Sequence, residues 1–288
     1  MIIDFRCKPP ILEAMQVHVN PPEHIAGYGG AYTKGQFHGT VDDFVMGPEK
    51  FLAKLDAAGV DRVVFCAGDR ETTVGRVLRN DTLVEFARFD PDRFICFAGA
   101  DPHKGMSAVR ELERAVRDLG MRGLFLSPWE HMLPPNHAKF YPLYAKCCEL
   151  DVPIILHCSI NFSYTIPMEY GNPQYLDQVA CDFPELKIIA SHGGWPWVPQ
   201  MCAVAWKHPK IFIEISGVSP KYIGMPNSGW EVLLQFGNSV LQDRILYGSD
   251  WPLLELDRTV TEVRDLPLKE EVKAKWLGLN AARLLDLH

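Results

Sequence analysis

The fold is indicated most clearly by the stretch Pro153-Ile154-Ile155-Leu156-His157, in which an uninterrupted apolar run ends in an imidazole. Similar short runs, rich in β-branched residues, begin near Ile2, Arg62, Phe94, Gly123, Lys187, Ile211 and Ile245. Runs that are apolar at nearly every position are typical of strands buried on both faces of a parallel sheet. The sequence therefore predicts eight parallel strands.

The segments between these runs have the periodicity of amphipathic helices, with apolar residues spaced three and four positions apart. The clearest are Pro48 to Ala58, Met106 to Leu119, Phe140 to Leu150, Trp230 to Leu241 and Glu270 to Leu287. Eight strand and helix units in 288 residues match a closed barrel. An open doubly wound sheet would carry a glycine-rich phosphate loop after an early strand, and the sequence has none. We therefore expect a single (β/α)8 TIM-barrel domain over residues 1–288.

The segment from Lys8 to Gly47, which follows the first strand, is rich in Pro, Gly, His and Tyr. It is too long for an ordinary connection between a strand and a helix. We expect it to fold over the mouth of the barrel.

Charge and composition exclude several classes of function. Lys and Arg number 29 against 36 Asp and Glu, which gives a net charge of -7, and the basic residues are not clustered as nucleic-acid binding requires. No apolar run is long enough to span a membrane, and the charged N-terminus does not match a signal peptide. The eight cysteines include no C-x-x-C pair. These features predict a soluble, cytoplasmic protein. Because barrels of this size often dimerise, a homodimer is the assembly that we expect by default.

Polar residues follow the apolar runs where a TIM barrel places its active site, at the carboxyl ends of the strands. They include Arg6 and Lys8 after the first run, Glu130 after the fourth, His157 after the fifth, His192 after the sixth and Asp250 after the eighth. Imidazole and carboxylate groups suit zinc and manganese. The pattern predicts one cavity around His157, His192 and Asp250.

Several motifs in this order resemble the amidohydrolase-related metal-dependent hydrolases and decarboxylases, a family that includes the aminocarboxymuconate semialdehyde decarboxylases. The motifs are Ile2-Ile3-Asp4, the histidine at 157, Ser191-His192-Gly193-Gly194, Gly248-Ser249-Asp250-Trp251-Pro252 and Asn280 to Leu285. The resemblance implies a divalent metal, zinc or else manganese, with His157 as a ligand. It also implies that Asp250 is a further ligand or the proton acceptor for metal-bound water, and that His192 acts as a nearby general acid or base or as an electrophile.

The first strand departs from the pattern of this family, which is Asp-x-His-x-His. Here the corresponding run is Asp4-Phe5-Arg6-Cys7-Lys8. Arginine is not a metal ligand, and a charged lysine repels a divalent ion. Three alternatives follow. A metal is held by His157, His192 and Asp250 plus water; or the site is metal-free and Arg6 or Lys8 replaces the metal; or the barrel binds a small molecule without catalysis.

The residues around this centre also indicate the kind of substrate. Arg6 and Lys8, with Glu130 nearby, favour a small anionic organic molecule. Trp195 and Trp251 follow the sixth and eighth strands and could form the walls for a flat ring. The expected activity is hydrolysis of a small organic acid, ester or lactone by metal-bound water. The alternatives are decarboxylation of an aromatic or unsaturated carboxylic acid, a metal-free lactonase and a non-catalytic binding barrel.

Overall fold

Eight parallel strands form one sheet in the computed structural model of the protein, which describes residues 1–19 and 40–287. In the order of the sheet they are β1 (Ile3–Cys7), β2 (Arg62–Cys66), β5 (Phe94–Gly99), β6 (Leu124–Leu126), β7 (Ile154–His157), β8 (Ile188–Ser191), β9 (Ile211–Glu214) and β10 (Ile245–Leu246). Each begins within one residue of the start of the apolar run that predicted it. The prediction of eight parallel strands is confirmed.

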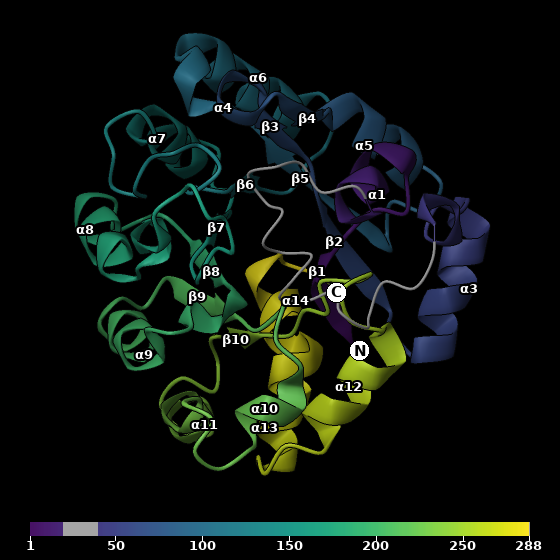
Figure 1. Ribbon diagram of the computed structural model, residues 1–288, viewed down its shortest axis with the longest axis vertical. Coiled ribbons are helices and arrows are strands. Elements are labelled where there is room, and N and C mark those ends of the chain that lie inside the picture. The colour runs from purple at the N-terminus through teal and green to yellow at the C-terminus, as the bar shows by residue number, and fades with distance from the viewer. Residues whose placement is uncertain (20–39, 288) are drawn as a thin grey trace.

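The sheet closes on itself because β10 and the chain after it bind back to β1. The amide of Phe5 donates to the carbonyl oxygen of Tyr247 at 2.8 Å, and the amide of Lys8 donates to that of Trp251 at 3.0 Å. Figure 1 shows the strands at the centre of the molecule with helices around them. The expected TIM barrel is therefore confirmed.

Helices follow the strands in the order that the sequence predicts. The longer ones are α1 (Leu12–Val19), α3 (Pro48–Ala58), α5 (Asn80–Ala87), α6 (Met106–Arg117), α7 (Tyr141–Glu149), α8 (Gln174–Asp182), α9 (Val198–Lys207), α11 (Glu231–Gly237) and α12 (Leu256–Arg264). Shorter helices are α4 (Glu71–Val74) and α10 (Pro220–Ile223). The predicted helix at Pro48 to Ala58 has the predicted ends. Within the described residues, no helix is long and apolar enough to cross a membrane.

Two features differ from the expected pattern. An antiparallel hairpin of β3 (Gly68–Arg70) and β4 (Arg76–Leu78) follows β2. The predicted final helix is divided into α13 (Glu270–Ala274), a π-helical turn (Lys275–Leu279) and α14 (Asn280–Leu284). Within this turn, Gly278 lies so close to the backbone of Met1 that a side chain there would collide with it. The apolar spacing does not reveal such a close approach of two chain segments.

The long segment after β1 is described only at its two ends. Its first part forms α1, and a short 3-10 turn at Val41–Asp43 leads into α3. The middle lies outside the described residues, and so does the expectation that it covers the mouth of the barrel.

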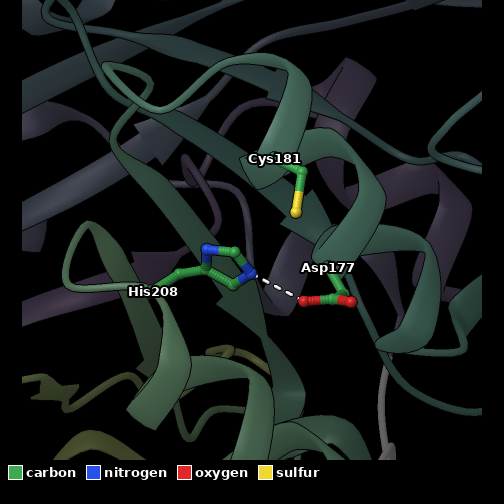
Figure 2. A group of neighbouring side chains, drawn as sticks. All are labelled: Asp177, Cys181 and His208. Atoms are coloured by element: carbon green, nitrogen blue, oxygen red, sulfur yellow. Dashed lines mark hydrogen bonds and ion pairs between the residues drawn. The ribbon is translucent and has the colours of Figure 1, made fainter.

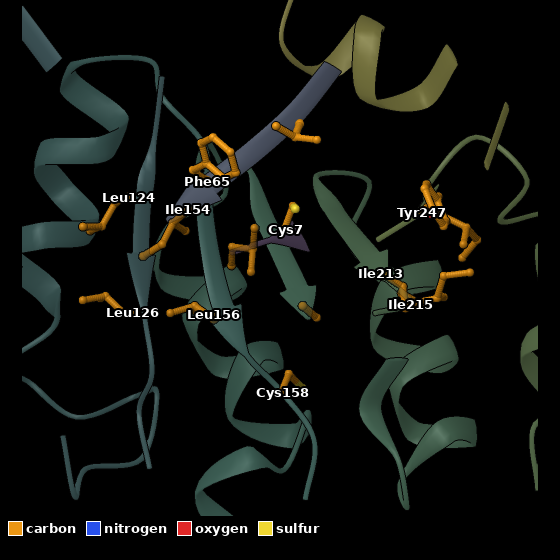
Figure 3. Packing of buried hydrophobic residues seen from close by; sticks show 14 of the residues in the cluster. Cys7, Phe65, Leu124, Leu126, Ile154, Leu156, Cys158, Ile213, Ile215 and Tyr247 are labelled. Carbon is orange, nitrogen blue, oxygen red and sulfur yellow. The ribbon is translucent and has the colours of Figure 1, made fainter. Parts of the chain in front are cut away.

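Alternating side chains divide the core into an inner and an outer part. Ile3, Phe5, Val64, Phe97, Ile155 and Ile189 belong to the inner cluster, with Ala281, Leu284 and Leu285 from the end of the chain. The outer cluster packs between strands and helices, where Figure 3 shows Phe65, Leu124, Ile154 and Leu156. Arg122, just before β6, donates to the carbonyl oxygen of Leu285 at 2.5 Å. The chain therefore returns to close the amino-terminal end of the barrel, opposite the end where the strands finish.

Candidate active site

An irregularity at the end of β1 directs Arg6, and Lys8 just after the strand, toward the barrel axis. The register between β1 and β2 shifts between Asp4 and Cys7. Phe5 packs in the inner cluster, and the guanidinium of Arg6 lies 4.1 Å from the centroid of Phe125 in the same cluster. Cys7 then packs in the outer cluster, as strand alternation predicts for a residue between two inward-facing ones.

The loop after β10 is fixed to β1 by a buried carboxylate, Asp4. Its oxygens accept hydrogen bonds from the amide of Ser249 at 2.9 Å, the hydroxyl of Ser249 at 2.5 Å and the amide of Arg6 at 3.0 Å. The next residue, Asp250, donates its own amide to the carbonyl oxygen of Arg6 at 2.7 Å. Asp250 therefore takes its position from β1, and its φ of 57° lies in the left-handed region.

Two cations lie beside the carboxylate of Asp250. Lys8 Nζ is 2.5 Å from Oδ1, and Arg6 Nε is 3.6 Å from the same oxygen. Burial favours the neutral carboxyl, but the charge of Lys8, followed by His192 and Arg6, outweighs it and lowers the pKa of Asp250 below its ordinary value. Asp250 is consequently an anion at neutral pH.

His157 and His192 face each other across the same space, with ring centroids 4.9 Å apart. Burial, followed by the neighbouring His192 and Arg6, holds the pKa of His157 well below its ordinary value. Burial lowers the pKa of His192 to about 4, against an opposing effect of Asp250. Both imidazoles are therefore neutral at neutral pH.

His157 is 4% exposed, and neither ring nitrogen has a hydrogen-bond partner among the described residues. Leaving a buried polar group without a partner costs about 1–3 kcal/mol. A neutral imidazole carries one donor and one acceptor. His157 is thus ready to bind a polar group of a ligand.

His192 is held from behind by β9 and the chain after it. Its Nδ1 lies 3.1 Å from the carbonyl oxygen of Ser216 and 3.0 Å from the Ser216 hydroxyl, which in turn lies 2.9 Å from Glu214 Oε2. A carbonyl oxygen only accepts hydrogen bonds, so this contact places the proton of the neutral ring on Nδ1. Nε2 is then the basic nitrogen. The backbone of His192 has a φ of 68°, also in the left-handed region.

A cavity of about 440 Å³ opens onto these groups. His157, His192, Ser216 and Asp250 contribute its polar lining. Its walls are largely apolar and include Phe162, Trp195, Tyr222, Met225 and Trp230. Such a cavity suits a small molecule with a flat apolar part and a few polar groups.

The structure brings four of the predicted site residues to this cavity: His157, His192, Trp195 and Asp250. Arg6 and Lys8 lie behind Asp250 rather than in the lining, and their charges are directed at its carboxylate. The two cations therefore pair with Asp250, whereas the sequence predicted that they would bind a substrate carboxylate.

Two further residues of the predicted site are not in the cavity lining. Trp251 is 1% exposed and packs on Phe51 in the outer core, with ring centroids 5.2 Å apart. It is directly beside Asp250 in sequence, and neighbouring side chains point in different directions. Glu130 is bound by Arg70 at 2.7 Å and Arg76 at 3.2 Å and is not in the cavity lining. The hairpin that supplies both arginines was not predicted.

Sequence reasoning missed much of the cavity wall. Phe162 comes from the loop after β7, and Tyr222, Met225 and Trp230 come from the segment between β9 and α11. These loops have no periodic pattern, so the sequence does not indicate which of their side chains face the cavity. The one available indication was their position after barrel strands, together with their unusual content of large apolar residues.

A divalent metal does not fit the floor of this cavity. It would share Asp250 with two cationic side chains, one of them at 2.5 Å. The ligand atoms of His157, His192 and Asp250 also fail to lie within 4.8 Å of one another; in the described part of the chain, Asp177, Cys181 and His208 are the set that does so. The positive charge of the Lys8 ammonium instead offsets the negative charge of the Asp250 carboxylate.

The fold and this site define a member of a known family. The family model described as Amidohydrolase matches residues 15–287, so the chain belongs to the amidohydrolase family. This confirms the resemblance of its motifs.

The chain is similar to several proteins over almost its whole length. The gamma-resorcylate decarboxylase of Rhizobium radiobacter is 24% identical over 328 residues, covering 95% of this chain and 98% of the relative. An uncharacterised TIM-barrel protein of Bordetella bronchiseptica has a TM-score of 0.81 and 27% identity, with 99% and 98% of the two chains covered.

A second similar structure contains a metal and an aromatic acid. It is the 5-carboxyvanillate decarboxylase of Novosphingobium aromaticivorans with bound manganese and 3-methoxy-4-hydroxy-5-nitrobenzoic acid. Its TM-score is 0.71 at 17% identity, with 99% of this chain and 96% of that chain covered. At this identity the likeness shows the fold alone.

Proposed function

We propose that the protein is a decarboxylase of small aromatic or unsaturated carboxylic acids that works without a divalent metal. The observation that carries the proposal is the pair of neutral, buried imidazoles, one of them without a hydrogen-bond partner, at the floor of a largely aromatic cavity. The similarity to the gamma-resorcylate decarboxylase of Rhizobium radiobacter supports this reaction over hydrolysis, which was the first expectation from sequence.

The apolar wall favours loss of carbon dioxide. A carboxylate that leaves water for such a wall loses hydration, whereas the transition state spreads its charge over the departing carbon dioxide and the ring. Phe162, Trp195 and Tyr222 provide this surface. The hydroxyl or enol oxygen of the substrate would bind between His157 and His192.

His192 supplies the proton transfer. Its Nε2 accepts the proton of the substrate hydroxyl, which increases electron density in the ring, and then returns that proton to the carbon that bears the carboxylate. The carbon–carbon bond breaks, carbon dioxide leaves, and the ring product remains as a phenolate or enolate that takes a proton from water. Asp250 stabilises the transient imidazolium, while Lys8 and Arg6 keep Asp250 ionised.

The test is a panel of ortho-hydroxylated benzoates and unsaturated acids, assayed for carbon dioxide after treatment of the protein with a chelator. In deuterium oxide, the vacated carbon should acquire one deuterium. His192→Asn should reduce the rate on the order of 10²- to 10⁴-fold, the usual contribution of general acid–base catalysis. The matched control, His137→Asn, changes a histidine outside the cavity lining and should have no effect.

Activity that disappears on chelation and returns with manganese or zinc would contradict the metal-free proposal. Absence of carbon dioxide from the whole panel would contradict decarboxylation.

Hydrolysis is the second candidate, because Nε2 of His192 is a base that could equally remove a proton from water. This reaction would act on an ester or lactone in the same cavity. A parallel panel of aryl esters and lactones distinguishes the two reactions, since hydrolysis releases an acid and consumes no carboxylate. Tight ligand binding without either reaction would instead indicate a binding barrel.

A further inference from the structure

Three side chains that commonly bind metals meet on the outer surface, on helices that pack beside each other. Asp177 and Cys181 are four residues apart on α8 and so lie on one face of the helix. His208 is the capping residue directly after α9. Figure 2 shows the three side chains directed toward a common space.

The spacing of these groups suits a metal ion. One ligand atom from each lies within 4.8 Å of the other two, and His208 Nε2 is 2.6 Å from Asp177 Oδ1. Zinc binds sulfur at about 2.3 Å and nitrogen or oxygen at about 2.0–2.2 Å, which places tetrahedral ligand atoms roughly 3–4 Å apart. Small side-chain movements would therefore admit the ion.

The donor set is that of zinc. Thiolate, imidazole and carboxylate are its usual protein ligands, and three protein ligands leave a fourth position for water. Cys181 is an exposed free thiol, while the side chains of Asp177 and His208 are 39% and 14% exposed. An ion can thus reach the site from solvent.

Lys207 now occupies one of the positions that the ion would use. Its Nζ lies 2.7 Å from the same Oδ1 of Asp177, and its side chain is 57% exposed. The Lys207 side chain can therefore give up its contact with Asp177 and move into solvent. A zinc ion would take over the interaction with Asp177.

We propose that Asp177, Cys181 and His208 form a zinc site that joins α8 to α9, with water as the fourth ligand. On binding, the Cys181 thiol releases its proton to solvent and the new sulfur–zinc bond forms, while Lys207 stays protonated. This site is separate from the barrel cavity, whose lining contains none of these residues.

The test is a titration of the chelator-treated, full-length protein with cobalt(II), which reports zinc sites by colour. A thiolate ligand should produce a near-ultraviolet charge-transfer band that saturates at one equivalent and disappears when zinc is added. The predicted centre of the barrel contains no thiol ligand, so this band distinguishes the two locations.

Variants identify the ligands. Cys181→Ala should abolish the band, and His208→Ala and Asp177→Ala should each weaken binding at least tenfold. Lys207→Met should strengthen it by removing the competing ammonium. The matched controls are Cys148→Ala, which removes another cysteine, and His157→Ala, which alters the barrel cavity; both should retain the band.

Zinc should also raise the melting temperature of the wild-type protein and not that of Cys181→Ala, because the ion joins two helices. The proposal is overturned if no band appears, or if the band persists in Cys181→Ala. It is equally overturned if the band is lost in Cys181→Ala but is unchanged in both His208→Ala and Asp177→Ala, since the thiol alone would then bind cobalt. None of these outcomes depends on whether the protein is a decarboxylase.

Discussion

Lys8 controls the charge of Asp250 more than any other residue does. Its ammonium is the nearer of the two cations, at 2.5 Å against 3.6 Å for Arg6, and it is the strongest of the groups that lower the Asp250 pKa. The lysine replaces a histidine of the family pattern. A single residue directly after β1 thereby changes the electrostatics at the far end of the chain.

Replacing Lys8 with Met should therefore reduce the turnover rate by on the order of 10²-fold. Burial would then raise the Asp250 pKa with only His192 and Arg6 left to oppose it, and a less fully ionised Asp250 would stabilise the imidazolium of His192 less. Steady-state rates as a function of pH measure this change. Lys273→Met is a suitable control because Lys273 pairs with the exposed Glu270. Equal rates in the wild type and Lys8→Met would show that the ion pair is structural.

The pH dependence of kcat/KM should report the ionisation of His192. Nε2 acts as a base only when the ring is neutral, so activity should fall as the pH drops through about 4, the pKa of His192. Arg6 lowers that pKa, so Arg6→Gln should move the acidic limb to higher pH. A limb near the ordinary histidine value of about 6.5 in the wild-type protein would argue against His192 as the base.

At the scale of elements, α14 and Leu285, which directly follows it, pack at the closed end of the barrel. Leu284 and Leu285 pack with Phe5 and Phe97 in the inner cluster, although the helix itself is short. The helix thus seals the end of the barrel that carries no catalytic groups. Substitutions here should therefore change the free energy of unfolding and not the rate of the reaction.

Leu285→Ala should lower the free energy of unfolding by about 2–5 kcal/mol, because it leaves a cavity among side chains that are already buried. Denaturant unfolding measures the change. Leu287→Ala provides the comparison, since Leu287 is only partly buried against the same cluster and should cost less. The rate per folded molecule should remain that of the wild type in both variants. A loss below about 0.5 kcal/mol for Leu285→Ala would contradict the packing described for α14.

The elements that sequence predicted best are those whose pattern is determined by burial on both faces. The strand at Pro153 to His157 is apolar throughout because helices cover it outside and other strands face it inside. The hairpin at β3 and β4 was missed because it lies after a strand, is partly exposed and has no apolar run. The final helix is divided by a turn in which Gly278 lies against the backbone of Met1, a residue distant in sequence, and the apolar spacing carries no sign of this contact.

At the scale of the whole molecule, the barrel explains why part of the site could be predicted. Parallel strands bring their carboxyl ends to one face, so His157, His192 and Asp250 had to meet once the strands were located. The partners of Arg6 and Lys8 could not be predicted, because they depend on an irregularity in β1 that has no sequence signature. Glu130 and Trp251 share the correct face but point to other partners.

The stability of the whole protein should depend on pH through Glu214. Burial raises the pKa of this residue from 4.5 to about 8. Between these values the folded state keeps a proton that the unfolded state releases. The free energy of unfolding therefore falls as pH rises from 4.5 to 8, by at most about 1.4 kcal/mol per pH unit.

Glu214→Gln should remove this contribution, because glutamine does not titrate. Denaturant unfolding of both proteins at several pH values between 5 and 8 measures it as a difference. Asp4, whose pKa burial raises to about 7, remains in both proteins and cancels. A parallel pH dependence in the two proteins would show that Glu214 is ionised in the folded state.

The left-handed backbone at His192 and Asp250 has a consequence for how this barrel could change over time. Residues with side chains occupy that region at a cost of about 1–3 kcal/mol, whereas glycine enters it freely. Glycine at either position would relieve the strain and also remove a group that faces the cavity. Selection for stability alone would therefore favour glycine at both positions. The presence of His192 and Asp250 indicates that their side chains serve the chemistry of the site at a cost in backbone stability.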